Sequence, residues 1–320
     1  MASGQLLEYY TYRKIIKWLL LALGLFPLKD AKIYYRVLPY IHLFLNVGNA
    51  LGMLGFVRAH ITDILVVSKC LGLTVSFLTG ALKLVCMIVY HEDIMNLFKM
   101  LDEHYNNLIN NVQLAKIVLD GVTTFKRLSW AVSLLVFLSG SVNIITPIVF
   151  IIFQHAHHIQ PIKYILPYLS IYPWMITPNG FLYKIHYTFE TIATFSLIAI
   201  TSSVEPLFAL YVIQMIGRLR VLSYQMIHLE ESNDSDSVIR GSILQYEVLL
   251  KCRNIVQKIF GPIILWMIIT NAVILCLDFV ANISNPNSSI PVLNKYVLDK
   301  QMNEFMVASF EDNDDLVVVS

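Results

Sequence analysis

Three clustered histidines and two acidic residues in apolar surroundings are the side chains of this sequence that could do chemistry. His155, His157 and His158 lie within four residues, a spacing that can present imidazole groups to a transition metal. They stand in a polar segment after a long apolar stretch, where histidines are usually only hydrated. We therefore expect no metal ion at this cluster.

Glu190 and Glu205 belong to an apolar stretch that begins near Lys184. A carboxylate within a membrane is a functional candidate by default, because it must face the interior of a helix bundle or a water-filled cavity. The simpler alternative places Glu190 at the outer membrane interface and Glu205 at the inner one. Residues 184–204 alone are long enough to cross a bilayer, which favours this alternative.

Motifs of nucleotide, zinc and hydrolase sites are absent, since the sequence contains no GxxxxGK[ST], GxGxxG, HExxH, CxxC or GxSxG. The net charge is +1 and no basic block is interleaved with aromatic residues, so nucleic acid is not an expected partner. The four cysteines are too scattered for a disulfide framework. We expect neither an enzyme nor a bound cofactor.

The element that organises the chain is the stretch from Leu128 to Phe153, whose 26 residues include no charged side chain. About 20 apolar residues in a helix cross a hydrocarbon layer roughly 30 Å thick, and a helix satisfies its own backbone hydrogen bonds there. The composition agrees, with 57% hydrophobic and 14% charged residues, because soluble domains carry about 25% charged residues. The sequence therefore predicts an integral membrane protein.

The predicted fold is an all-α, polytopic transmembrane helix bundle between residues 37 and 281. We expect about five spans, at residues 37–57, 64–90, 128–153, 184–206 and 259–281. Residues 1–36 are basic around an apolar core too short to span, which indicates an interfacial helix. Residues 207–258 have the pattern of a helical hairpin outside the membrane, and residues 282–320 form an atypical polar tail.

Charge asymmetry predicts the orientation of these spans. Of the 23 Lys and Arg residues, 16 lie in residues 1–36, 91–127 and 217–258, which would all share one side of the membrane. The positive-inside rule then places the N-terminus in the cytoplasm. Two glycosylation sequons, at Asn282 and Asn287, follow the fifth span and would lie outside, although a third at Asn233 falls on the cytoplasmic side.

Several short runs stand out along the chain: Tyr172-Pro173-Trp174, Thr177-Pro178, Tyr183, Tyr187-Thr188-Phe189-Glu190, Glu205, Gln214-Met215-Ile216-Gly217-Arg218-Leu219 and Cys276-Leu277-Asp278-Phe279. In their order along the chain, these runs resemble the patterns of the insect odorant receptors. The basic N-terminus, the long cytoplasmic connections and the aromatic, proline-rich connection at residues 154–187 resemble that family too. The resemblance covers about residues 1–281.

The resemblance implies seven helices, with the N-terminus in the cytoplasm, in the plasma membrane of a sensory neuron. It also implies a tetramer with a common co-receptor that forms an odorant-gated cation channel, whose pore is lined by the last helix. No sixth or seventh span is predicted after residue 281, so conduction by this chain alone is not expected. A gustatory-type chemoreceptor and a non-functional, truncated receptor product remain the alternatives.

A pocket for a small volatile odorant should be apolar, with one or two polar groups that orient the ligand. The exterior halves of the second, third and fourth spans offer such faces, and we expect the connection at residues 154–187 to fold as a lid over them. The candidate ligand-binding residues are Leu73, Phe77, Gly140, Asn143, Ile144, Pro147, Thr191, Phe195 and Ile198. Ordinary helix–helix packing, with Gly140 as a point of close approach, is the alternative for each of them.

Overall fold

The structure is a computed structural model that describes residues 2–26, 28, 32–109, 112–119, 121–174, 177, 180–228 and 235–284. Within these residues every regular element is a helix, which confirms the all-α prediction. The helices are α1 (Ala2–Ala22), α2 (Ile33–Ala59), α3 (Ile64–Val89), α4 (His91–Ile109), α5 (Val112–Val118), α6 (Val122–Ala156), α7 (Phe181–Ile227) and α8 (Ser235–Ser284).

Among the described helices, α2, α3, α6, α7 and α8 are long and apolar enough to cross a membrane, as the sequence predicted. The last two are longer than any bilayer requires, since the 47 residues of α7 extend for about 70 Å. The helix α7 continues through Pro206 without a break. Parts of α7 and α8 therefore extend beyond the apolar layer, and their bounds contain the fourth and fifth predicted spans.

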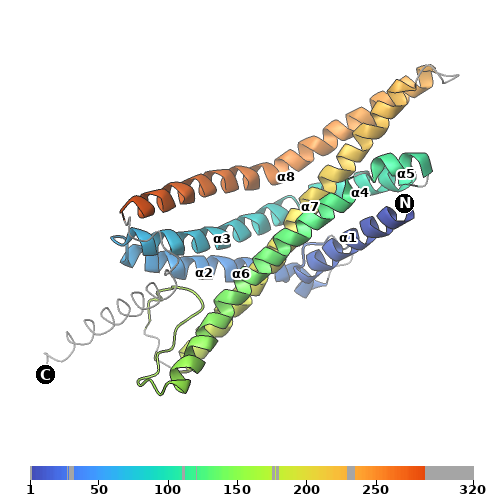
Figure 1. Ribbon diagram of the computed structural model, residues 1–320. Helices are drawn as coiled ribbons and strands as arrows, with labels where there is room; N and C mark the ends of the chain where they lie inside the picture. Colours follow the sequence, from blue (N-terminus) through green and yellow to red (C-terminus); the bar gives the residue numbers. More distant parts are fainter. Residues whose placement is uncertain are drawn as a thin grey trace.

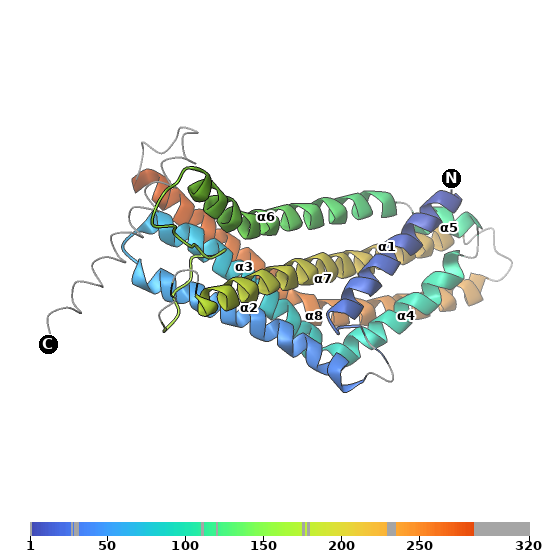
Figure 2. The same ribbon diagram turned by 90° about the horizontal axis from the view of Figure 1, so that it is seen from below.

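The helices form an elongated bundle whose two ends differ in structure (Figure 1). The helices α2, α3 and α8 run side by side, while α6 and α7 pack together and cross them. At one end of the molecule α1, α4 and α5 gather around α7, and the connection between α6 and α7 lies at the opposite end (Figure 2). The bundle thus has a helical end and a loop-covered end, joined by long helices.

Exposed apolar side chains indicate which helices have surfaces suited to contact with lipid. On α6, Leu135 and Val142 are 67% and 62% exposed, and on α8, Leu275 is 69% exposed. Such side chains would be costly in water, but lipid tails are as apolar as leucine and solvate them without penalty. The outer surfaces of α6 and α8 therefore suit a hydrocarbon environment or a neighbouring helix.

The N-terminal helix α1 packs into the helical end of the bundle. Tyr9 and Tyr12 are almost completely buried, and the Tyr12 hydroxyl donates to the Pro206 carbonyl over 3.1 Å, whereas Trp18 is exposed. At the same end Gln214 donates to the Tyr9 hydroxyl over 2.7 Å. One face of α1 is therefore part of the hydrophobic core, in contrast to a helix that only lies on a lipid surface.

Candidate functional site

The connection between α6 and α7 inserts Tyr168 among the helices at the loop-covered end. Tyr168 is 4% exposed, and its ring makes an edge-to-face contact with Phe77 of α3 at a centroid distance of 5.2 Å. Its hydroxyl lies 2.8 Å from Thr194 Oγ1 of α7, and the Asn143 side chain of α6 lies near this hydroxyl. Tyr168 therefore joins α3, α6 and α7 through one side chain.

In the hydrogen bond between Tyr168 and Thr194, the Tyr168 hydroxyl is the donor. The Thr194 hydroxyl already donates to the Glu190 carbonyl oxygen over 2.7 Å. Because a threonine hydroxyl has a single hydrogen, it accepts from Tyr168. Burial raises the pKa of Tyr168 to about 12, so the phenol keeps the proton that this bond requires at any physiological pH.

Glu190 anchors the same connection from α7. Its side chain is fully buried and accepts hydrogen bonds from the Tyr168 backbone N–H (3.1 Å), the Ser170 hydroxyl (2.6 Å) and the Tyr172 hydroxyl (3.0 Å). Three donors compensate for much of the cost of burying this polar group. Glu190 thus lies beneath the connection, whereas the simpler sequence interpretation placed it at an open membrane interface.

Aromatic stacking extends this anchor toward the start of α7. Trp174 Nε1 donates to His186 Nε2 over 2.8 Å, and the Tyr172 ring lies 4.1 Å from the His186 ring and 5.7 Å from that of Trp174. Burial raises the pKa of the Tyr172 hydroxyl above its ordinary value, so it remains a donor to Glu190. Residues 168–174 of the connection are therefore held in place by specific side-chain contacts.

A glycine of α2 lets the connection approach closely. The Ile171 N–H donates to the Gly52 carbonyl oxygen over 3.0 Å. A Cβ atom at Gly52 would lie 3.2 Å from the Tyr172 ring and 3.3 Å from Ser170 Cβ. The absence of a side chain on this face of α2 thus makes room for the segment that carries Tyr168 and its neighbours.

Several predicted pocket residues are brought together by this arrangement. Phe77 and Asn143 both contact Tyr168, and Gly140 packs so closely on α7 that a Cβ atom there would lie 2.8 Å from Ile198 Cδ1. The remaining positions are as follows: Leu73 is partly buried near Phe77, Ile144 accepts a hydrogen bond from the Tyr187 hydroxyl (2.9 Å), Pro147 is buried, and Thr191 donates to the Tyr187 carbonyl oxygen (2.7 Å).

Phe195 differs from the other candidates because it is 53% exposed. It lies on the same helix as the buried Thr194, but its ring does not enter the enclosed region around Tyr168. Helical periodicity alone could not separate these neighbouring positions. The residues that sequence reasoning missed are Tyr168, Thr194 and the anchoring role of Glu190, for which only the aromatic richness of residues 154–187 and an acidic residue in an apolar stretch were signals.

A second polar contact lies deeper in the bundle, between α3 and α7. Lys83 is 2% exposed, and its Nζ atom is 2.6 Å from Glu205 Oε1. The sequence analysis singled out Glu205 as an acidic residue in an apolar stretch but did not predict a partner for it. The two charges neutralise one another, which is how intramembrane ionisable residues are usually accommodated.

Metal chemistry has no visible basis in the described residues. No group of three His, Cys, Asp or Glu side chains among them could hold a metal ion. His155, His157 and His158 are exposed at the end of α6. The side chains that meet at the loop-covered end are mostly apolar and aromatic, with a few hydrogen-bonding groups.

Comparisons with solved structures identify a similar fold. The chain is similar to the insect olfactory receptor OR5 from Machilis hrabei, with a TM-score of 0.60 and 16% identity over 84% of this chain and 71% of that one. It is also similar to the same receptor in complex with eugenol, with a TM-score of 0.57 and 15% identity over the same shares. No curated protein matches the sequence.

A family model gives the assignment that such low identities cannot. The model described as 7tm Odorant receptor matches residues 63–292, which is most of the chain and includes α3 to α8. The described helices agree with this match, because they form an all-α bundle like that of the solved receptor. The chain belongs to the insect odorant receptor family.

Proposed function

We propose that this chain is an odorant receptor subunit that binds a small volatile molecule between α3, α6 and α7, next to Tyr168. The observation that carries the proposal is that Tyr168 is held at its hydroxyl by Thr194 and at its ring by Phe77, with the Asn143 side chain near the hydroxyl. A ligand there would meet apolar walls and two side chains able to form hydrogen bonds. That combination gives both affinity and orientation for an apolar molecule with one polar group.

Tyr168 would couple ligand binding to the helices. A ligand hydroxyl group competes with the Tyr168 hydroxyl as donor to Thr194, and a ligand hydroxyl or carbonyl group can accept from the Asn143 amide, while the apolar part of the ligand displaces the Tyr168 ring from Phe77. The Tyr168 N–H and the Tyr172 hydroxyl both donate to Glu190 of α7. A shift of Tyr168 would therefore change the hydrogen bonds that connect this segment to α7. Binding energy is thus converted into a change at a helix that runs the full length of the molecule.

The ligand class has support from the solved relative. That receptor was solved in complex with eugenol, and this chain has a similar fold. We infer that the ligand of this chain is likewise a small organic molecule, with a polar group that can form hydrogen bonds with Tyr168, Asn143 or Thr194. None of these residues carries a net charge at neutral pH, which disfavours a charged ligand.

The signalling part of the proposal concerns assembly. The chain would join a co-receptor in a hetero-oligomer, a tetramer, that forms a ligand-gated cation channel as a multi-pass protein of the plasma membrane. The N-terminus would be cytoplasmic, as the Lys and Arg distribution indicates. The outward-facing apolar surfaces of α6 and α8 and the cytoplasmic hairpin at residues 207–258 are the surfaces available for contact with lipid or with other subunits.

Ligand-evoked current in cells that co-express the chain with a co-receptor tests the pocket. Asn143→Leu and Phe77→Ala should change the ranking of ligands by potency, each by about tenfold for the most affected ligand. Phe195→Ala is the matched control, because Phe195 is on α7 but largely exposed, and it should leave the ranking unchanged. An unaltered ranking in both pocket variants, with normal surface expression, would refute the pocket.

The hairpin at residues 207–258 is proposed as a subunit contact. The second arm of the hairpin has an apolar face that includes Leu244 and Cys252 and continues to Ile259. The chain itself covers part of this face, since Cys252 and Ile259 are fully buried, but Leu244 is 63% exposed. A photo-crosslinking residue at Leu244 should therefore capture the co-receptor, whereas the same residue at the buried Cys252 should not. Absence of any crosslink from Leu244 in a current-carrying complex would exclude this contact.

Topology and glycosylation form a separate part of the proposal. The predicted domains are the interfacial segment 1–36, the bundle 37–281 and the tail 282–320, with Asn282 and Asn287 glycosylated outside. The Asn282 side chain and all of Asn287 lie outside the described residues. A tag on Met1 should be reached by antibody only after permeabilisation, and Asn282→Gln with Asn287→Gln should remove any glycan-dependent shift in gel mobility.

A further inference from the structure

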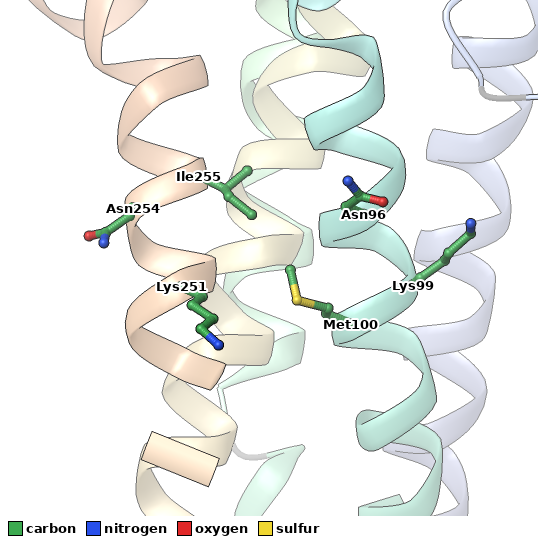
Figure 3. Close-up of a pocket in the computed structure, with 6 residues that line it drawn as sticks. All are labelled: Asn96, Lys99, Met100, Lys251, Asn254 and Ile255. Carbon is green, nitrogen blue, oxygen red and sulfur yellow. The ribbon is translucent and has the colours of Figure 1, made fainter. Parts of the chain in front are cut away.

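A groove lies between α4 and α8 at the helical end of the molecule, away from Tyr168 (Figure 3). Its volume is about 570 Å³, and it is lined by Asn96, Lys99, Met100, Lys251, Asn254 and Ile255. Each helix contributes one lysine, one asparagine and one apolar side chain, within a single stretch of five residues. At spacings of three and four residues these three side chains share one face of their helix.

The floor of the groove is apolar and its rim is polar. Met100 and Ile255 are half-buried and point toward one another across the space between the helices (Figure 3). The core beneath them is closed, because Leu97, Leu101 and Cys252 are fully buried. The lysines and asparagines of both helices are exposed beside this apolar base, and in Figure 3 Lys251 extends toward the space between the helices, whereas Lys99 and Asn254 extend away from it.

The residues that line this groove include two lysines and no acidic side chain. Among the described side chains, no carboxylate lies within ion-pair distance of Lys99 or Lys251. Lys258 adds a third ammonium group one to two turns along α8, where it is paired with Asp93 at 2.7 Å. A lining that combines two lysines, no acidic side chain and an apolar floor is complementary to an anionic, amphipathic ligand.

Along the helices, the groove lies at and beyond the outer edge of the lipid headgroup region. The apolar helix α3 ends at Val89, and the fifth predicted span begins at Ile259. At about 1.5 Å per residue, the lining residues stand roughly 6–16 Å beyond those points. The polar region of a bilayer is roughly 5–8 Å deep on each face, so the groove begins among the headgroups and continues just past them.

We propose that this groove binds the headgroup of an inner-leaflet phosphoinositide, an anionic lipid whose ring phosphates project beyond the phosphodiester layer. Lys251 contacts the ring phosphates in the orientation that Figure 3 shows, and Lys99 reaches them by rotation of its flexible, exposed side chain, while Asn96 donates to phosphate or ring hydroxyl oxygens. Met100 and Ile255 contact the glycerol end of the lipid. The leaflet, but not the site itself, rests on the proposed orientation with a cytoplasmic N-terminus.

Binding is tested with the full chain in detergent micelles and a fluorescent, short-chain phosphatidylinositol 4,5-bisphosphate, by fluorescence anisotropy. The expected result is saturable binding that Lys99→Gln with Lys251→Gln weakens about tenfold or more. Lys116→Gln with Arg240→Gln is the matched control: it removes the same charge from exposed positions on α5 and α8 outside the groove, and it should leave the affinity unchanged. Equal weakening by both double variants, or none by either, overturns the proposal.

Competition separates a lipid site from a general phosphate site. Unlabelled phosphatidylinositol 4,5-bisphosphate should displace the probe, and phosphatidylcholine of the same chain length should not. Displacement by inorganic phosphate at concentrations similar to that of the lipid would overturn the assignment to a lipid. Micelles have no inner leaflet and no odorant is added, so failure here leaves the proposed odorant function and orientation untouched, and failure of those leaves this binding measurement standing.

Discussion

Lys83 of α3 and Glu205 of α7 form an ion pair in the interior of the bundle, with Nζ 2.6 Å from Oε1. The Lys83 side chain is 3% exposed and the Glu205 side chain 33%. An ammonium group buried among apolar helices requires a counter-charge, because its transfer from water is otherwise very unfavourable. The pair therefore fixes the positions of α3 and α7 along one another. The next residue of α7 is Pro206, which has no N–H and so leaves one backbone hydrogen bond of this helix unmade.

Glu205→Gln should destabilise the protein strongly, since it leaves the Lys83 ammonium buried without a counter-charge. The expected loss is about 3 kcal/mol, at the low end for broken buried pairs because Glu205 is partly exposed. Thermal unfolding of the detergent-solubilised chain measures the effect, and adding Lys83→Met to Glu205→Gln should restore much of the lost stability. Glu247→Gln, at an exposed position of α8, is the control; an equal loss there would argue against the pair.

Phe77→Ala and Phe195→Ala should have very different effects on stability, although both remove a phenyl ring from an apolar helix. Phe77 is 1% exposed and Phe195 is 53% exposed. Removal of the Phe77 ring leaves a cavity beside Tyr168 and should cost about 3–5 kcal/mol. Removal of the Phe195 ring should cost less than about 1 kcal/mol. Thermal unfolding in the same detergent compares them, and similar losses would show that Phe195 is buried in the working protein.

Gly140→Leu should disrupt the packing of α6 on α7, whereas Gly140→Ala should be mild. A Cβ atom at Gly140 would lie 2.8 Å from Ile198 Cδ1 and 3.0 Å from Thr194 Cγ2. The end of the Ile198 side chain can rotate away from a methyl group, but a leucine side chain has to separate the helices, at a cost of about 1–3 kcal/mol. The elution profile and melting temperature of the solubilised chain measure this. Val142→Leu, on the exposed side of α6, should be neutral; an equally mild Gly140→Leu would contradict close packing.

Alkaline pH should destabilise the wild-type protein more than it destabilises the Tyr168→Phe variant. The pKa of Tyr168 is about 12 in the folded protein and 10.0 without the protein environment. A raised folded-state pKa contributes stability below pH 10 that is lost as the pH rises from about 10 to 12, because only the unfolded chain then ionises readily. The melting temperature measured from pH 8 to 11 should therefore fall less steeply for Tyr168→Phe. Identical slopes would mean that Tyr168 is not buried.

The sequence determined the spans and the fold class. Uncharged stretches such as Leu128–Phe153 predict membrane helices because hydropathy is a local property, which needs no knowledge of neighbouring elements. Among the described residues there are five helices long and apolar enough to span a membrane, which is the number predicted. The sequence also singled out Phe77 and Asn143 as pocket candidates, since each lies on an apolar helix face toward the exterior half of its span.

Only the tertiary structure decided which side chains meet. Whether Phe195 or Thr194 turns toward α6 depends on the rotation of α7 in the bundle, and neighbouring positions on one apolar helix carry no pattern that reveals it. Tyr168 lies in a connection without helical periodicity, and its partners Phe77, Asn143 and Thr194 come from three different helices. In an apolar sequence, long-range hydrogen bonds and ion pairs select the partners, and these contacts exist only after the helices have packed.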